Sequence, residues 1–281
     1  SCDMITIRKT KHEQETGENE MKCKWTAAVV CALSFFVASA ADTWYVAKNG
    51  NDTTGDGSEA NPYRTIQKGV DKASSGDTVM VGEGDFDGVG RTVTHEGVGV
   101  LTAVVIDKKL TLQGAGRGKT FITGAYGDGT GGFADTGAGA HRCIYAASGS
   151  NGSVVRGFTI RKGATTRANS GVNNDLDLGG GVVSCNGNTL YLMDCDVLDC
   201  RAGEGAAASR DVRACNKSRG GSQVFYRNSY TFNCLFENNG PTPAAGQIFT
   251  VVQDYHVVNC TFINNSVDRI LMVNSDRKAY C

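Results

Sequence analysis

Proline is scarce in this chain, with 3 residues in 281, and charge of one sign is lacking. Lys and Arg (28) offset Asp and Glu (29), which leaves a formal net charge of −1. Without a basic surface, general affinity for nucleic acid is not expected. Glycine is abundant instead, with 37 residues and no collagen-like period. This composition is typical of many tight turns between short strands.

Hydrophobic runs long enough to span a bilayer, which takes roughly 20 apolar residues, are missing too. One shorter run, WTAAVVCALSFFVASA, follows Met21-Lys22-Cys23-Lys24 and ends in the small residues of positions 38–40. This pattern predicts a secretory signal peptide over 21–40, cleaved after Ala40, and a secreted or cell-surface protein. Residues 1–20 are highly charged, and we expect them to be disordered or artefactual. The domain is then 41–281, and its repeat-like end predicts truncation at the C-terminus.

Sequence signatures of metal, nucleotide and hydrolase sites are missing as well. The cysteines form no Cys-x-x-Cys pair and have no suitably spaced His, and neither Gly-x-Ser-x-Gly nor His-Glu-x-x-His occurs. Residues 114–120, GAGRGKT, lack the first Gly of a phosphate-binding loop, and 127–132, GDGTGG, have no helix beside them. We therefore predict no nucleotide partner and no resident cofactor, with Ca²⁺ left open for the enzyme hypothesis below.

A repeat runs through the second half of the chain. NCLFENNG at 233–240 and NCTFINNS at 259–266 share five of eight positions, and RGFTIRKG (156–163) and MDCDVLDC (193–200) align with them. One column contains Phe158, Cys195, Cys234 and Cys260, and the column two residues later contains Ile160, Val197, Phe236 and Phe262. Apolar residues at period 2 indicate half-buried strands, and recurrence at 26 to 39 residues indicates a solenoid.

The repeated residues have structural roles in such a solenoid. Equivalent residues of successive coils stack about 4.8 Å apart, so Phe236 should stack on Phe262. Asn239 and Asn265 should form a corner ladder of amide hydrogen bonds. The column Cys195, Cys234 and Cys260 should fill the core as small apolar side chains. A disulfide between two of these cysteines, or a reactive thiol, remains an alternative.

The opening of the domain carries a resemblance to a known superfamily. Residues 44–86, WYVAKNGNDTTGDGSEANPYRTIQKGVDKASSGDTVMVGEGDF, resemble the start of secreted right-handed parallel β-helix proteins of the pectate-lyase-like superfamily. Further on, GGGVV at 179–183 with FENN and FINN is similar to repeats of chlamydial polymorphic outer membrane proteins. The resemblance implies an all-β, right-handed parallel β-helix solenoid. Ile66, Val70 and Ala73 share one helix face and predict a short N-terminal capping helix.

Enzymes of this superfamily suggest where chemistry would lie. Its polysaccharide lyases pair a Ca²⁺-binding carboxylate cluster with an Arg or Lys base. On the outward face of the aligned strands, Asp194 and Asp196 are the candidate carboxylates and Arg161 the candidate base. The galacturonase signature is absent, because His141 stands in GAHRC rather than in Gly-His-Gly. Leu198, Leu235 and Ile263 share the same outward positions, which favours a solvated strand face without catalysis.

A loop offers a second candidate site. Residues 163–179 form a long insertion after a repeated strand, and such insertions often mark the binding face of a repeat protein. Arg167, Asp175 and Asp177 lie there among Asn and Ser residues that could bond sugar hydroxyls, although an ordinary polar loop has the same composition.

Two functions are consistent with these features. The leading hypothesis is an exported, adhesin-like β-helix that is not an enzyme and binds a polysaccharide, a cell-surface glycan or another surface. The alternative is a polysaccharide lyase or related carbohydrate-active enzyme that acts on uronate polymers. Fold alone cannot separate the two.

Overall fold

The structure is a computed structural model. It describes residues 41–95, 98–130, 137–164, 180–184, 188–202, 220–225, 229–241, 247–251, 255–265, 269–273 and 279–280. The segment 1–20 and the signal peptide predicted at 21–40 lie outside the described residues, as do Arg167, Asp175 and Asp177. Those predictions therefore stay predictions.

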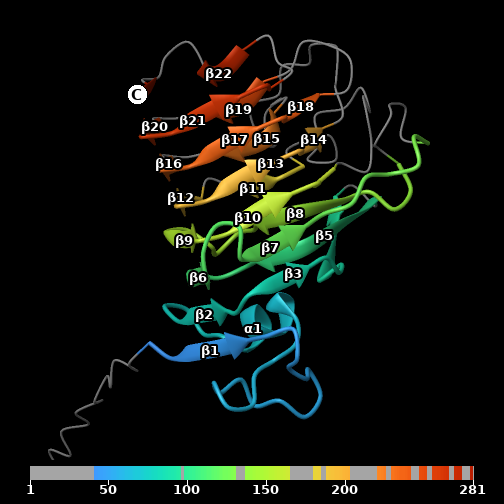
Figure 1. Ribbon diagram of the computed structural model, residues 1–281, viewed down its shortest axis with the longest axis vertical. Helices are drawn as coiled ribbons and strands as arrows, with labels where there is room; N and C mark the ends of the chain where they lie inside the picture. Colours follow the sequence, from blue (N-terminus) through green and yellow to red (C-terminus); the bar gives the residue numbers. More distant parts are fainter. Residues whose placement is uncertain are drawn as a thin grey trace, which may run out of the picture. The chain divides into compact units, whose positions relative to one another are not determined.

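The domain is a parallel β-helix whose coils contribute strands to three sheets (Figure 1). We name each sheet after one of its strands. The β9 sheet has eight strands: β1 (Thr43–Val46), β2 (Thr78–Val81), β6 (Thr111–Gly114), β9 (Ser153–Arg156), β12 (Leu190–Met193), β16 (Ser229–Phe232), β20 (Tyr255–Val258) and β23 (Ala279–Tyr280). The β10 sheet has six: β3 (Gly84–Phe86), β7 (Thr120–Thr123), β10 (Thr159–Arg161), β13 (Asp196–Leu198), β17 (Leu235–Glu237) and β21 (Thr261–Ile263).

The third sheet, the β8 sheet, contains the one antiparallel pair among the described strands. Its strands are β4 (Arg91–His95), β5 (Val98–Ile106), β8 (His141–Ala146), β11 (Val182–Ser184), β15 (Gly220–Phe225), β19 (Gln247–Val251) and β22 (Arg269–Val273). β4 pairs antiparallel with β5, whereas all other strand pairs are parallel. Two short strands, β14 (Arg201–Ala202) and β18 (Gly240–Pro241), pair beside them. The predicted all-β parallel solenoid is confirmed.

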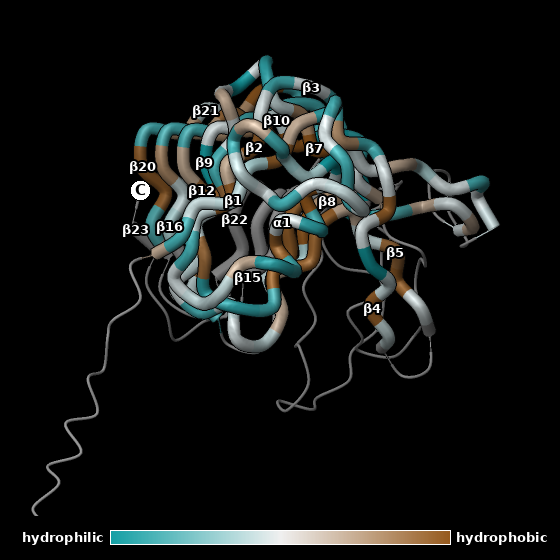
Figure 2. Tube along the Cα trace, turned by 90° about the horizontal axis from the view of Figure 1, so that it is seen from below, coloured by the Kyte–Doolittle hydropathy of each residue, from teal (hydrophilic) through white to brown (hydrophobic). Residues whose placement is uncertain are grey.

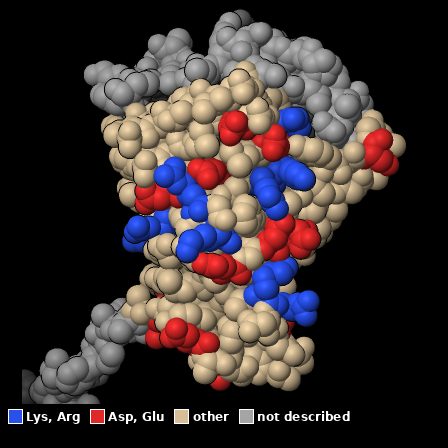
Figure 3. Space-filling model, viewed as in Figure 1, with Lys and Arg blue, Asp and Glu red and all other residues tan. Residues whose placement is uncertain are grey.

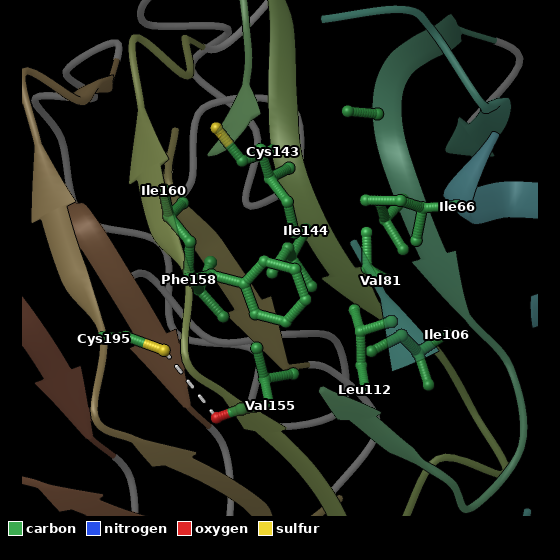
Figure 4. Close-up of a cluster of buried hydrophobic side chains, with 14 of the residues drawn as sticks. Ile66, Val81, Ile106, Leu112, Cys143, Ile144, Val155, Phe158, Ile160 and Cys195 are labelled. Carbon is green, nitrogen blue, oxygen red and sulfur yellow. Dashed lines mark hydrogen bonds between the residues drawn. The ribbon is translucent and has the colours of Figure 1, made fainter. Parts of the chain in front are cut away.

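The core follows the columns of the repeat. In the β10 sheet, Ile122, Ile160, Val197, Phe236 and Phe262 are register partners from strand to strand. The first four are fully buried, and the rings of Phe236 and Phe262 stack with centroids 5.1 Å apart. Figure 4 shows Phe158, Ile160 and Cys195 directed into this interior with Leu112, Ile144 and Val155 from the facing strands.

The cysteine column lies one corner before these strands and packs against the same core. Cys195 and Cys234 are buried, and Cys260 is partly buried. All three are free thiols, and the Cys195 Sγ donates a weak hydrogen bond to the Val155 carbonyl at 3.8 Å. Burial raises the pKa of the Cys195 thiol to about 12. The thiol is therefore protonated at neutral pH and suits a role as apolar filler.

Left-handed residues form the corners on both sides of the β10 sheet. Before its strands stand Gly157, Asp194, Asn233 and Asn259, with φ of 73°, 51°, 50° and 52°. After its strands stand Lys162, Asp199, Asn238 and Asn264, with φ between 48° and 55°. Gly, Asn and Asp tolerate this conformation best, which explains their recurrence. Figure 2 shows hydrophilic positions at the same corner of successive coils beside β12, β16 and β20.

An asparagine ladder closes the second corner. The Asn239 side chain is fully buried, and its Nδ2 donates to the Val197 carbonyl at 2.7 Å while its Oδ1 accepts from the Cys200 N–H at 2.9 Å. Asn265 repeats this pattern one coil later, with its Nδ2 donating to Phe236 O at 2.9 Å and its Oδ1 accepting from Asn239 N. Each amide therefore satisfies one N–H and one C=O of the preceding coil and ties the two coils together.

The first coil is closed by the predicted helix, α1 (Ile66–Lys72). Thr65 caps it, with Oγ1 accepting from the Lys68 N–H at 3.3 Å, and Ile66 and Val70 are buried against the core. The outer edge of β1 is occupied as well. The Tyr45 N–H donates to Gly57 O at 2.8 Å, and Tyr45 O accepts from Tyr63 N at 2.9 Å. In the described part of the chain, no helix is long and apolar enough to cross a membrane.

Candidate functional site

The candidate site is the outward surface of the β10 sheet, which we call the outer face. Strand register places its side chains in two columns, about 4.8 Å apart from coil to coil. The first column is Asp85, Phe121, Thr159, Asp196, Leu235 and Thr261, and the second is Thr123, Arg161, Leu198, Glu237 and Ile263. In Figure 3, drawn from the same side as Figure 1, side chains of both charges are interspersed on the middle of the visible surface.

Arg161 is the best-anchored side chain of the outer face. Its Nη2 donates to Asp85 Oδ2 at 2.7 Å, and its Nε donates to Thr123 Oγ1 at 3.0 Å. Thr123 in turn donates to Asp85 Oδ1. The guanidinium carbon lies 4.3 Å from the ring centroid of Phe121, a cation–π distance. Arg161 is therefore fixed across the intervening strand β7 by charge, hydrogen bonding and stacking.

A second charged pair comes from a loop that folds over the same sheet. Arg117, in the loop between β6 and β7, places its Nη1 3.5 Å from Asp196 Oδ1 and donates to Asn233 O at 3.3 Å. Next to it, the Gly118 N–H donates to Thr159 Oγ1 at 2.9 Å. Thr159 points outward yet is only 2% exposed, because this loop covers it. The GAGRGKT segment thus supplies an arginine to the outer face.

Asp196 is the titratable group whose environment is most unusual on this face. Burial raises the pKa of its carboxyl, and the charge of Glu237 on the adjacent strand acts in the same direction. Arg117 and the Thr159 hydroxyl oppose the shift. The pKa nevertheless remains above its ordinary value, so the cost of burying the charge exceeds the gain from its partners.

Asp194 and Asp196 do not act together. The alignment put both on one strand, but only Asp196 lies in β13, whereas Asp194 occupies the left-handed corner before it. Asp194 accepts from Asn233 Nδ2 at 2.8 Å and lies 3.6 Å from Arg156 Nη2. Among the described residues no group of three or more His, Cys, Asp or Glu could hold a metal ion. The two carboxylates, each with its own partners, do not fit a Ca²⁺ site.

Spacing of the carboxylates also limits the chemistry. Asp85 and Asp196 belong to one outward column but are separated by β7 and β10, which is three strand spacings or roughly 14 Å. Inverting glycosidases hold their two carboxyl groups about 6.5–9.5 Å apart and retaining ones about 5–5.5 Å. Among the carboxylates of the two columns, Asp196 and Glu237 lie diagonally on neighbouring strands, with backbones close enough for such a pair.

Of the four residues that form the two ion pairs of this face, Asp85 and Arg117 were not among the candidates from the sequence. Asp85 belongs to β3, whose sequence GDF has no repeat signature, and Arg117 belongs to a loop that sequence analysis interpreted only as a failed phosphate motif. Arg161 and Asp196 were candidates, and both lie on the outer face. Leu198, Leu235 and Ile263 share it, and Ile263 is 40% exposed.

Comparison with known proteins gives one family match. The model of a family described as "Protein of unknown function (DUF1565)" matches residues 48–176. It covers less than half of the chain. Asp85, Arg117 and Arg161 fall within the matched segment, whereas Asp196 falls outside it. No curated protein matches the chain.

Solved structures similar to this one come from pectin-active enzymes. A pectin methylesterase in complex with a hexasaccharide is 12% identical over 79% of this chain, with a TM-score of 0.38. This chain spans 66% of that protein, slightly less than two thirds. A pectin methylesterase from carrot is 13% identical over 83% of this chain and 88% of its own, with a TM-score of 0.34. A rhamnogalacturonan lyase is 15% identical over 85% and 86%, with a TM-score of 0.31.

Proposed function

We propose that this chain is an exported, adhesin-like β-helix protein that binds glycans through the outer face without catalysing a reaction on them. One observation carries the proposal: the Arg161–Asp85 pair, whose guanidinium stacks on Phe121, lies on the same sheet surface as the Arg117–Asp196 pair. Successive coils thus present donors, acceptors and an aromatic ring at regular spacing. An extended polysaccharide has hydroxyl groups at regular spacing that can meet such an array.

Fixed side chains favour binding over catalysis. Arg161 is already held by three partners, so contact with a ligand costs little additional side-chain entropy. The same contacts count against the lyase alternative. A lyase base must accept the sugar C5 proton, whereas the Arg161 guanidinium is committed to Asp85 as a cation.

A carbohydrate-active enzyme acting on uronate polymers is the second candidate, and one observation favours it. Asp196 has a raised pKa and a second carboxyl, Glu237, on the adjacent strand. Two carboxyls whose environments differ are a frequent arrangement of acid and base in sugar hydrolysis. Arg161 would then bind a uronate carboxylate in place of acting as a base.

Glycan binding is tested with the full chain on a panel of immobilised polysaccharides that includes polygalacturonate and neutral xylan. We expect Arg161→Ala and Arg117→Ala to weaken binding roughly tenfold each, since each removes a hydrogen bond donated by a charged group. Lys109→Gln, an exposed cation away from the outer face, is the matched control. Equal binding by all of these variants would contradict the proposal.

Catalysis and export are tested separately. Incubation with uronate polymers and Ca²⁺ should produce no ultraviolet absorbance from an unsaturated product and no new reducing ends. Turnover that is lost in Asp196→Ala or Glu237→Gln would establish the second candidate. For export, the mature protein recovered outside the cell should begin at Ala41, the residue after the predicted cleavage position.

A further inference from the structure

A cavity of about 500 Å³ lies at the first coil, and no side chain of the two outer-face columns lines it. It is bounded by the first turns of α1, by the segment 87–90 between β3 and β4, and by part of β5. This size falls within the range of small-molecule sites in proteins. Cationic, acidic and apolar side chains all line it, so the disposition of its charges determines which ligand it suits.

Each carboxylate in the lining has a hydrogen-bond donor or an ion-pair partner in the protein. Asp52 accepts from the Arg64 and Thr65 N–H groups at 2.8 and 3.0 Å and from the Thr65 hydroxyl at 2.7 Å. Asp71 accepts from Arg91 Nη2 at 2.5 Å and from Gln67 Nε2 at 2.7 Å. Asp87 lies 3.7 Å from Lys48 Nζ. These acids are engaged, and none is left over to attract a cation.

Two cations of the lining have no such partner. In the described part of the chain, neither the Arg64 guanidinium nor the Lys68 ammonium has a carboxylate within ion-pair distance. Lys68 Nζ lies 5.9 Å from the ring centroid of Tyr63, which still leaves its donors available. The acids of the cavity are paired, whereas Arg64 and Lys68 have no carboxylate partner. The cavity therefore favours an anionic ligand.

An apolar wall completes the cavity. Phe86 and Val89 line it, and Val89 is 46% exposed, which is unusual for a large aliphatic side chain. The segment that carries Val89 is held against β5, because the Gly90 N–H donates to Thr102 O at 2.9 Å. A Cβ at Gly90 would lie 2.1 Å from the Ala103 carbonyl oxygen, so only glycine permits this approach. The wall is therefore positioned by backbone contacts.

We infer that this cavity binds a small organic carboxylate that carries a ring or another apolar face, with the carboxylate on Arg64 and Lys68 and the apolar face on Phe86 and Val89. Arginine and lysine together recognise a carboxylate by charge and by directed N–H groups. This site is separate from the proposed glycan-binding face and does not depend on it. None of the four side chains that would contact the carboxylate ligand belongs to the outer face.

The test is isothermal titration of the full chain with cinnamate, with its uncharged analogue cinnamamide and with inorganic phosphate. Saturable binding of cinnamate is expected, and cinnamamide and phosphate should each bind at least roughly tenfold more weakly, since one lacks the charge and the other the ring. Equal affinity for cinnamamide, stronger binding of phosphate, or no saturable heat with cinnamate would each overturn the inference.

Variants locate the site. Arg64→Gln and Lys68→Gln should each weaken cinnamate binding roughly tenfold, because each removes a charge-assisted hydrogen bond. Val89→Glu places a negative charge in the cavity at an exposed position and should also abolish binding without affecting folding. Lys72→Gln, an exposed cation of the same helix outside the cavity, is the control and should bind as the parent does. Unchanged affinity in Arg64→Gln and Lys68→Gln would rule this cavity out.

Discussion

The Arg161 guanidinium and the Asp85 carboxylate meet at 2.7 Å although the residues are 76 positions apart. They belong to β10 and β3, which do not pair with each other, because β7 lies between them. The side-chain contact therefore spans three coils and passes over Phe121. It adds a direct side-chain contact between β3 and β10, whose backbones are hydrogen-bonded to β7 and not to each other.

This contact can be measured with a double-mutant cycle of Asp85→Asn and Arg161→Gln. The side chains are 40% and 31% exposed, so solvent screens the pair. We expect a coupling energy of about 0.5–1 kcal/mol in the free energy of unfolding, measured by urea denaturation. The coupling should decrease at high salt. Strict additivity of the two single substitutions would show that the contact does not form in solution.

Phe236→Ala should destabilise the domain strongly. The side chain is fully buried and stacks on Phe262, so its removal leaves a cavity between coils. The expected loss in the free energy of unfolding is about 3–5 kcal/mol. Ile263→Ala serves as control, because Ile263 is 40% exposed and should cost less than about 0.5 kcal/mol. Similar losses for both variants would contradict the register of the β10 sheet.

Asn239→Ala should lower the free energy of unfolding by more than the small number of deleted atoms suggests. The substitution removes the amide that serves Cys200 N–H and Val197 O, and it leaves both backbone groups unpaired in a buried corner. We expect a loss of about 2 kcal/mol or more in denaturant unfolding. Asn239→Asp should also destabilise the domain, because a carboxylate cannot donate to Val197 O. Asn238→Gly should lie near zero, since Asn238 is exposed with φ of 55°.

Asp196→Asn tests the electrostatics of the outer face through pH. The folded pKa of Asp196 lies above its ordinary value of 3.8, because burial disfavours the charged form. The carboxyl therefore contributes full stability below the unfolded pKa and loses it as pH rises through the folded pKa. The variant should gain stability relative to the parent between pH 3.5 and pH 7, followed as the difference in unfolding free energy. A difference that is constant with pH would show that the pKa is not raised.

The cysteine column predicts an order of alkylation. Burial raises the pKa of Cys195, and the hydrogen bond with Cys260, together with burial, raises the pKa of Cys234; the same hydrogen bond lowers the pKa of Cys260. Because the thiolate is the nucleophile, iodoacetamide at pH 8 should modify Cys260 before Cys195 and Cys234 in the folded protein. Peptide mass spectrometry identifies the site. Recovery of all three cysteines in disulfides to distant partners would contradict the column.

Sequence analysis could predict the core of the fold but not the composition of the outer face. Period-2 apolar residues and the aligned columns determine which side of β10, β13, β17 and β21 is buried, because a shift by one residue would expose Phe236. Asp85 and Arg117 could not be found this way. They come from coils and loops without the repeat, and their contacts are formed only when distant coils stack.

The corner position of Asp194 could have been predicted from the sequence. Its column is Gly157, Asp194, Asn233 and Asn259, residue types that tolerate a left-handed backbone. From the alignment we predicted that this column belongs to the strand. Its composition of Gly, Asp and Asn indicates a corner instead. The loops have no aligned columns of this kind, because the insertions differ in length and sequence from coil to coil. Their contacts could therefore not be predicted.

The closed edges at the first coil determine how this molecule can meet another copy of itself. A β-helix end normally offers free N–H and C=O groups on which a further coil could grow. Here the loop around Gly57 and Tyr63 occupies the edge of β1, and antiparallel β4 ends the β8 sheet. A parallel strand from a second molecule finds the Tyr45 backbone of β1 already bonded, and at the β8 sheet it meets β4, which runs antiparallel to the other strands. Continuation of the parallel ladder by a second molecule is thus disfavoured at β1 and β4.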